Sequence, residues 1–146
     1  MGARKRLSAE ARKEAQKNVC NAEAFGVPTS PRKMRLLADV LREKDVFEAL
    51  NILTYTTQHA SKTLEKLLRS AVANWEQKFN VKAADSELYV KELTVDSARM
   101  LKRFLPAPQG RAYRLRKRSN HVSVVLASRT IAEAEVESSE SSTNEN

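Results

Sequence analysis

Acidic residues are absent from the most basic part of the chain. No Asp or Glu occurs between Ser97 and Thr130, although this stretch contains nine Lys and Arg residues. Its centre reads LKRFLPAPQGRAYRLRKR, in which two apolar and basic arms flank a turn that contains two prolines. Like charges that face each other across a hairpin repel. Such a hairpin therefore needs a negatively charged partner, and the net charge of +8 also indicates one.

Cysteine and long apolar runs are scarce as well. Cys20 is the single cysteine, which excludes an internal disulfide framework and is typical of a reducing compartment. We interpret it as a small apolar core residue, because no histidine in a recognisable context accompanies it. No apolar run approaches the ~18 residues of a membrane span. The sequence predicts a soluble intracellular protein.

The residues that catalysis would need are also missing. His59 and His121 are the only histidines, and they are far apart in the chain. No Cys/His spacing typical of a metal site occurs, and the three glycines form no phosphate-binding loop. The carboxylates are scattered, as on solvated helix surfaces. We therefore expect a protein that is not an enzyme and has no cofactor, no metal and no catalytic residue.

The charge is unevenly distributed along the chain. The last segment, residues 131–146, contains five Glu and no Lys or Arg. We predict three parts: a basic N-terminal extension at 1–17, one globular domain at 18–130, and an acidic, disordered tail at 131–146. The extension is interpreted either as a disordered or frayed helical leader or as an RNA-contacting arm.

Three segments show helical periodicity. Ser30 and Pro31 predict the start of a helix that buries Met34, Leu37, Ala38 and Leu41. Asp45 begins a second helix, with Glu48 placed for a capping box. A third covers about 58–79, and its stripe is the strongest structural signal in the sequence: Leu64, Leu67, Leu68, Ala71, Val72, Trp75 and Phe79.

Alternating patterns then predict strands. A short strand is expected at 18–27, and HVSVVLA at 121–127 is a β-branched return strand. Between 88 and 95 the alternation changes phase, which a bulge near Lys91–Glu92 would reconcile. The fold class is therefore α+β, with a long hairpin at about 93–123 whose arms, 93–105 and 111–123, would reach ~40 Å at ~3.3 Å per residue.

Two basic clusters are candidate phosphate sites. The helix start SPRKMR carries Arg32, Lys33 and Arg35, where the helix dipole disfavours cations unless a phosphate docks there. In the hairpin, basic side chains would neutralise phosphates while Phe104 and Tyr113 stack on bases or sugars. The predicted RNA-binding residues are Arg32, Lys33, Arg35, Arg99, Lys102, Arg103, Arg111, Arg114, Arg116, Lys117, Arg118 and, near the hairpin base, His121.

At these residues the sequence resembles the large-subunit ribosomal protein twenty-two family of the bacterial type. The matching stretches are SPRKMRLLADVLREKDVFEALNILTYT (30–56), SAVANWE (70–76), VDSARMLKRFLP (95–106) and GRAYRLRKRSNHVSVVL (110–126). They follow the family's order and spacing and together cover roughly 18–129. Four separate matches make the resemblance specific.

The resemblance implies three helices packed on a small three-stranded antiparallel sheet, with a hairpin that extends into ribosomal RNA. It further implies a structural constituent of the large subunit that acts in the cytoplasm, binds large-subunit ribosomal RNA and aids subunit assembly. Neighbouring large-subunit proteins and the nascent polypeptide would be its other partners. The residues implied to line the peptide exit tunnel are Leu101, Lys102, Arg103, Pro106, Ala107, Pro108, Gln109 and Gly110. Changes near Leu101–Arg103 are associated in the family with macrolide resistance.

Two positions depart from the family pattern. Family tips commonly read Pro-Arg-Ala-Lys-Gly-Arg-Ala, whereas residues 106–112 here read Pro-Ala-Pro-Gln-Gly-Arg-Ala and lack two cations. Trp75 stands where a small Ala is usual, so the third helix must pack differently.

Other functional classes remain as alternatives. An architectural DNA-binding protein would also use basic β-ribbon arms with prolines at the tip, but such proteins generally act as dimers. We expect no homo-oligomer here. A basic membrane-surface protein is disfavoured because the basic residues do not form one dense helix face, and no membrane contact is expected.

Overall fold

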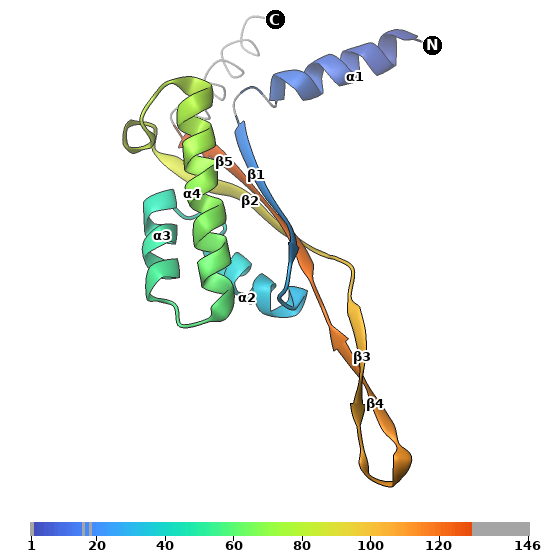
Figure 1. Cartoon of the computed structure of the whole chain (residues 1–146). Coiled ribbons are helices and arrows are strands. Elements are labelled where there is room, and N and C mark those ends of the chain that lie inside the picture. The colour runs from blue at the N-terminus through green and yellow to red at the C-terminus, as the bar shows by residue number, and fades with distance from the viewer. Residues whose placement is uncertain (1, 16, 18, 130–146) are drawn as a thin grey trace, which may run out of the picture.

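A computed structural model of the protein describes residues 2–15, 17 and 19–129 and shows helices packed on one face of a small sheet (Figure 1). A narrow two-stranded ribbon extends from one end of this sheet. In chain order the elements are α1 (Gly2–Ala15), β1 (Val19–Val27), α2 (Pro31–Leu41), α3 (Val46–Tyr55), α4 (His59–Phe79), a 3₁₀ turn (Ala83–Asp85), β2 (Leu88–Ser97), β3 (Leu101–Pro106), β4 (Ala112–Lys117) and β5 (Asn120–Ser128).

β5 is the central strand of the three-stranded sheet, whose order is β1-β5-β2. It pairs antiparallel with β2 from Leu88↔Ser128 to Ser97↔Asn120, and with β1 along its other edge. The register with β2 shifts between Val90 and Glu92, so the predicted bulge is confirmed. Because side chains alternate along a strand, this extra residue keeps both halves of β2 directed at the core.

The helices bury the faces that their periodicity predicts. In α2 the buried side chains include Met34, Leu37, Ala38 and Leu41, as expected. The third predicted helix is α4, and its apolar stripe lies against the sheet. Cys20 is buried in the same core, as predicted. Burial raises the pKa of its thiol above the ordinary value, and the nearby positive charge of Lys78 offsets this only in part.

The predicted capping box at α3 is wrong. Asp45 does occupy the N-cap position, but its side chain makes no cap hydrogen bond. Its carboxylate instead pairs with Arg129 at 2.9 Å, and Glu48 pairs with Lys44 at 2.7 Å. Both carboxylates thus pair with a cation at the exposed surface instead of bonding to the backbone N–H groups of the first turn.

The α+β class is confirmed, but the numbers of elements differ from the prediction. The described residues form four helices, because residues 2–15 of the N-terminal extension are helical as α1. They form five strands, because pairing along the hairpin is interrupted. Three residues (98–100) on one arm face two (118–119) on the other, so β3 and β4 form a sheet of their own. The predicted tail at 131–146 lies outside the described residues.

Trp75 fills the middle of the core and is 1% exposed. Its ring lies 4.1 Å from that of Phe79, centroid to centroid, and its indole N–H is buried without a hydrogen-bond partner among the described residues. The large ring is therefore accommodated at the cost of one unsatisfied donor.

We predict that Trp75→Ala lowers the free energy of unfolding by about 3–5 kcal/mol, because it leaves a cavity. Trp75→Phe removes the unsatisfied N–H and keeps most of the ring, so its effect should be within about 1.5 kcal/mol. Urea denaturation followed by circular dichroism measures both. Equal losses in the two variants would contradict this account.

Candidate nucleic-acid interface

The ribbon formed by β3 and β4 has no core. Every residue of both strands is exposed, including the large apolar side chains of Leu101, Phe104 and Tyr113. An isolated two-stranded hairpin is at best marginally stable in water. The ribbon therefore depends on its attachment to the sheet for stability.

The register of the ribbon separates two faces. Lys102 lies opposite Arg116 and Phe104 opposite Arg114, so these four share one face, called the basic face here. On the other face Arg103 lies opposite Leu115 and Leu105 opposite Tyr113, with Leu101 opposite Lys117. One face thus combines three cations with one aromatic ring, and the other is mainly apolar with two cations.

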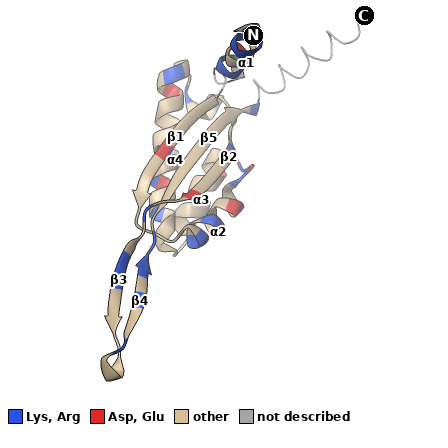
Figure 2. Ribbon diagram, turned by 90° about the vertical axis from the view of Figure 1, so that its right-hand side faces the viewer, with Lys and Arg blue, Asp and Glu red and all other residues tan. Residues whose placement is uncertain are grey.

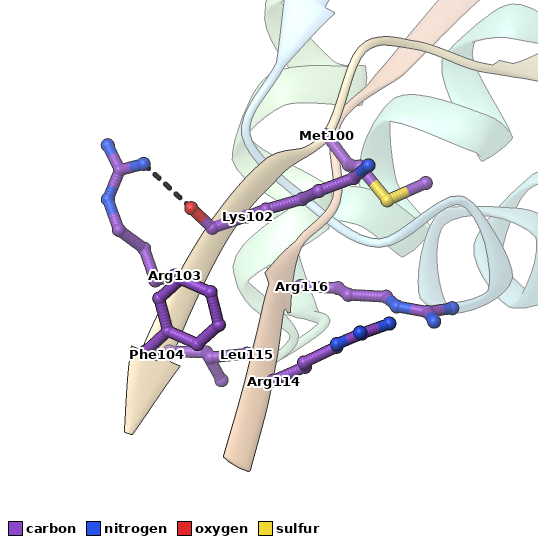
Figure 3. Close-up of a pocket in the computed structure, with 7 residues that line it drawn as sticks. All are labelled: Met100, Lys102, Arg103, Phe104, Arg114, Leu115 and Arg116. Carbon is purple, nitrogen blue, oxygen red and sulfur yellow. Dashed lines mark hydrogen bonds between the residues drawn. The ribbon is translucent and has the colours of Figure 1, made fainter. Parts of the chain in front are cut away.

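Side chains of the ribbon line an open hollow of about 510 Å³ (Figure 3). Lys102, Arg114 and Arg116 extend to the same side of the two strands. Arg103 extends to the other side, and its Nη1 donates a hydrogen bond to the carbonyl of Lys102 at 2.9 Å. These three cations point the same way, no carboxylate lines the hollow, and phosphate oxygens are suitable acceptors for such charged donors.

The tip of the ribbon is a tight turn. The backbone N–H of Ala107 donates to the carbonyl of Arg111 at 2.9 Å. Gln109 and Gly110 both have positive φ angles, 63° and 69°. Glycine adopts this conformation without strain, whereas Gln109 bears a steric cost of about 1–2 kcal/mol. Residues 106–110 at the tip carry no charged side chain.

The base of the ribbon is fixed to the body through Asn120. This residue is fully buried, and its Nδ2 donates to the backbone carbonyl and to Oγ1 of Thr29, at 2.9 and 2.7 Å. Across the interruption, the N–H of Ala98 donates to the carbonyl of Ser119 at 3.0 Å. The start of the ribbon therefore lies beside the loop that leads into α2.

The first turn of α2 presents Arg32 and Lys33 to solvent. Lys33 lines a groove of about 580 Å³ that also includes His59 and Ala60 at the start of α4. Two helix N-termini thus border this groove, and their helix dipoles favour an anion there. The sequence did not predict His59 as a residue of this groove, because nothing in it indicates that the start of α4 lies beside α2.

Arg35 is engaged within the protein. Its Nε and Nη2 both donate to the carbonyl of Val95 in β2, at 3.2 and 2.8 Å. Arg42, two helical turns further on, donates in the same way to Leu93 at 3.2 and 3.1 Å and also pairs with Asp39. Both arginines bond to carbonyls on the outer edge of β2. Arg42 was not predicted, although its spacing from Arg35 places both on one side of α2.

The other edge of the sheet is covered in the same manner. Asn74 and Lys78 of α4 donate to the carbonyls of Asn21 and Val19 in β1, at 3.3 and 2.6 Å. Both edge strands therefore have carbonyls bonded by helix side chains, which blocks pairing with another strand.

His121 supports the sheet close to the ribbon. Its Nδ1 accepts a hydrogen bond from the N–H of Gly26 at 3.1 Å, at a bulge in β1 where Gly26 has a φ of 67°. The ring of Phe25 lies edge-on at 5.3 Å. Only Nε2 of His121 is left for an external ligand.

The remaining predicted cations, Arg99, Arg111 and Arg118, are exposed along the arms. Figure 2 shows Lys and Arg along β3 and β4 and no Asp or Glu there, whereas both signs of charge occur over the helices. Among the described residues, no group of three or more His, Cys, Asp or Glu could hold a metal ion. No described helix is both long and apolar enough to cross a bilayer.

Comparison with known proteins identifies the family. The model for "Ribosomal protein L22p/L17e" matches residues 22–127. This chain belongs to the L22p/L17e family of ribosomal proteins. A relative named "Large ribosomal subunit protein uL22" from Parabacteroides distasonis is 60% identical over 126 residues, which cover 86% of this chain and 93% of the relative.

Further relatives in the L22p/L17e family carry the same name. The protein from Bacteroides fragilis is 55% identical over 130 residues (89% of this chain, 96% of the relative), and that from Flavobacterium johnsoniae is 57% identical over 127 residues (86% and 93%). Their name assigns these relatives to the large ribosomal subunit. Membership of this family confirms the predicted resemblance and the prediction that the protein is not an enzyme.

The two arginines that bond to β2 give a testable distinction between structural and ligand-binding cations. Lysine keeps the charge but loses the planar fork. We predict that Arg35→Lys and Arg42→Lys each lower the free energy of unfolding by about 1–2 kcal/mol, since hydrogen bonds to charged groups contribute about this much. Chemical denaturation measures the change. Arg32→Lys, at an exposed position on the same helix, is the control and should have no effect; equal stabilities in all three variants would contradict the assignment.

Proposed function

We propose that this protein is a structural constituent of the large ribosomal subunit and binds large-subunit ribosomal RNA, mainly through the β3–β4 ribbon. The observation that carries the proposal is a fully exposed ribbon with cations on both faces and no acidic side chain in either strand. RNA supplies phosphates for the cations and bases for stacking on Phe104 and Tyr113. Membership of the L22p/L17e family supports RNA over DNA as the partner.

RNA on both sides of the ribbon would also offset the repulsion between its cations that exists in the unbound protein. Lys102 and Arg116 are directly paired across the strands, and like charges in this position destabilise a sheet. Phosphates between these side chains reverse the sign of that interaction. Binding therefore stabilises the ribbon, and the ribbon in turn holds RNA segments together, which favours assembly of the subunit.

The anchor of the proposed complex is the first turn of α2, where Arg32 and Lys33 are exposed beside the groove shared with α4. Arg35 contributes mainly by fixing α2 to β2, with its remaining N–H groups available to a phosphate. Arg99, Arg103, Arg111, Lys117 and Arg118 extend the contact along the arms.

We place the ribbon tip at the wall of the peptide exit tunnel, in contact with the nascent polypeptide. The tip is the part of the ribbon furthest from the helices, and residues 106–110 carry no charge (Figure 1). An uncharged surface suits contact with passing peptides of any sequence. Exposed Phe47 and Tyr55 on α3 fit contacts with neighbouring ribosomal proteins. The protein would act in the cytoplasm as part of the ribosome.

Sedimentation tests the association. After a high-salt wash, we expect stoichiometric recovery with large subunits in a sucrose gradient, because a ribbon enclosed by RNA is not released as surface contacts are. For the purified protein on large-subunit RNA, Arg114→Ala/Arg116→Ala should reduce the slope of log K against log salt by about 1.4–1.8, or 0.7–0.9 for each phosphate contact.

The matched control is Lys62→Ala/Lys66→Ala, which removes the same charge from the exposed surface of α4. It should leave the salt slope almost unchanged. Equal salt slopes in the two variants would show that RNA binding depends only on net charge and would contradict the role of the ribbon. Recovery at the top of the gradient would reject the ribosomal assignment.

The tunnel position is tested by photo-crosslinking. A photoreactive residue at Gln109 should crosslink to a stalled nascent chain in purified ribosomes. The same residue at Thr94, an exposed position on β2, is the control and should not. Nascent-chain crosslinks from Thr94 alone, or from neither position, would contradict a tunnel-lining tip.

A further inference from the structure

None of the α1 side chains that the structure describes is buried. Its side chains from Arg4 to Lys13 are all exposed, and its only large apolar residue, Leu7, is 60% exposed. Isolated helices shorter than about 12–15 residues are marginal in water, and most protein helices are stabilised by packing an apolar face. In this 14-residue helix, residues 4–13 provide no such face. A stable α1 therefore requires a partner outside the chain segment described here.

The charges of α1 are segregated around the helix axis. Arg4, Ser8 and Arg12 are four residues apart and lie on one side, along about 12 Å of the axis. With Lys5 and Ala9 they line a shallow hollow of about 480 Å³ that contains three cations and no carboxylate. We call this surface the α1 stripe.

The acidic counterpart lies elsewhere on the helix. Glu10 pairs with Arg6 at 3.5 Å, and neither residue lines the hollow. The first turn of α1 has no acidic residue, although acids there would interact favourably with the helix dipole. The stripe thus combines uncompensated cations with a small hydroxyl side chain at its centre.

This pattern selects a polyanion over other partners. A helix that binds membrane surfaces needs a broad apolar face, and Leu7 alone does not provide one. Phosphates accept charge-assisted hydrogen bonds from Arg and Lys, and Ser8 adds a hydroxyl donor. The stripe resembles the ribbon in its lack of acids but not in its apolar content.

We propose that the α1 stripe is a second RNA-binding surface, which docks on phosphates of an RNA segment separate from the one around the ribbon. The proposal rests on the proposed function, since the ribosome provides the RNA. It concerns a part of the chain that the family model, which matches residues 22–127, does not cover.

The two surfaces lie at opposite ends of the sheet. β1 starts at Val19, opposite Ala127, whereas the ribbon leaves from the end marked by the Ser97↔Asn120 pair (Figure 1). The nine residues of β5 separate these ends by about 30 Å. The protein would therefore connect two RNA segments across the length of its sheet.

Site-specific crosslinking in assembled large subunits tests the stripe. A benzophenone residue at Ser8, within the stripe, should crosslink to RNA. The same residue at Leu7, on the same helix but outside the stripe, is the control and should give at most a few per cent of that yield. Crosslinks from Ser8 to protein alone, to the acidic tail, or to nothing would overturn the proposal.

A binding measurement on protein-free ribosomal RNA keeps this test separate from the ribosomal assignment. Arg4→Ala/Lys5→Ala/Arg12→Ala in the full chain should reduce the salt slope by about 2–3, at 0.7–0.9 for each lost phosphate contact. Lys62→Ala/Lys66→Ala/Arg69→Ala removes equal charge from α4 and should not. Unaltered slopes overturn the α1 proposal. If the unmodified chain cosediments with large subunits, that failure leaves the ribbon's proposed function intact.

Discussion

The pairing of β5 with β2 supports the β3–β4 ribbon, which extends beyond the body of the protein. A ribbon with no buried side chain and with cations opposite cations does not stabilise itself. It continues from the two strands that form the longest pairing in the sheet, and it departs where Asn120 is buried and bonded to Thr29. The apolar core beneath β5 therefore provides the stability that the ribbon lacks.

Arginine has two distinct uses in this molecule, and geometry rather than sequence decides between them. Arg35 and Arg42 direct their guanidinium groups at backbone carbonyls of an edge strand, where they replace a missing neighbouring strand. Arg114 and Arg116 project from an exposed ribbon into a hollow that no carboxylate lines. Arginine thus stabilises the fold at the edge of β2, whereas on the ribbon it leaves positive charge exposed to solvent.

Local patterns in the sequence were sufficient for much of the fold. Three features each reflect contact with one core: the helical stripe that includes Leu64 and Trp75, the phase change at Lys91–Glu92, and the alternation in residues 121–127. The spacing of apolar residues alone was therefore enough to identify them. The candidate ribbon followed from charge and alternation together, because both are local properties.

Features that depend on distant partners were not predictable in this way. Asp45 pairs with Arg129 instead of capping α3, and Arg35 bonds to Val95; in both cases the partner is at least 60 residues away along the chain. The interruption between β2 and β3 depends on unequal arm lengths, three residues against two, which alternation does not reveal. Helix α1 has no apolar stripe, so periodicity gave no reason to choose helix over a disordered leader.

The covered edges of the sheet have a consequence for the protein before it meets its partner. A free edge strand can recruit strands from other chains and so begin aggregation. Here helix side chains bond to the outer carbonyls at Val19 and Asn21 on one edge and at Leu93 and Val95 on the other. The ribbon's own edges stay open, but mutual repulsion between the dense positive charges of two copies opposes their association. Covered sheet edges and charge repulsion thus both disfavour strand pairing between free chains, while the ribbon stays exposed for its partner.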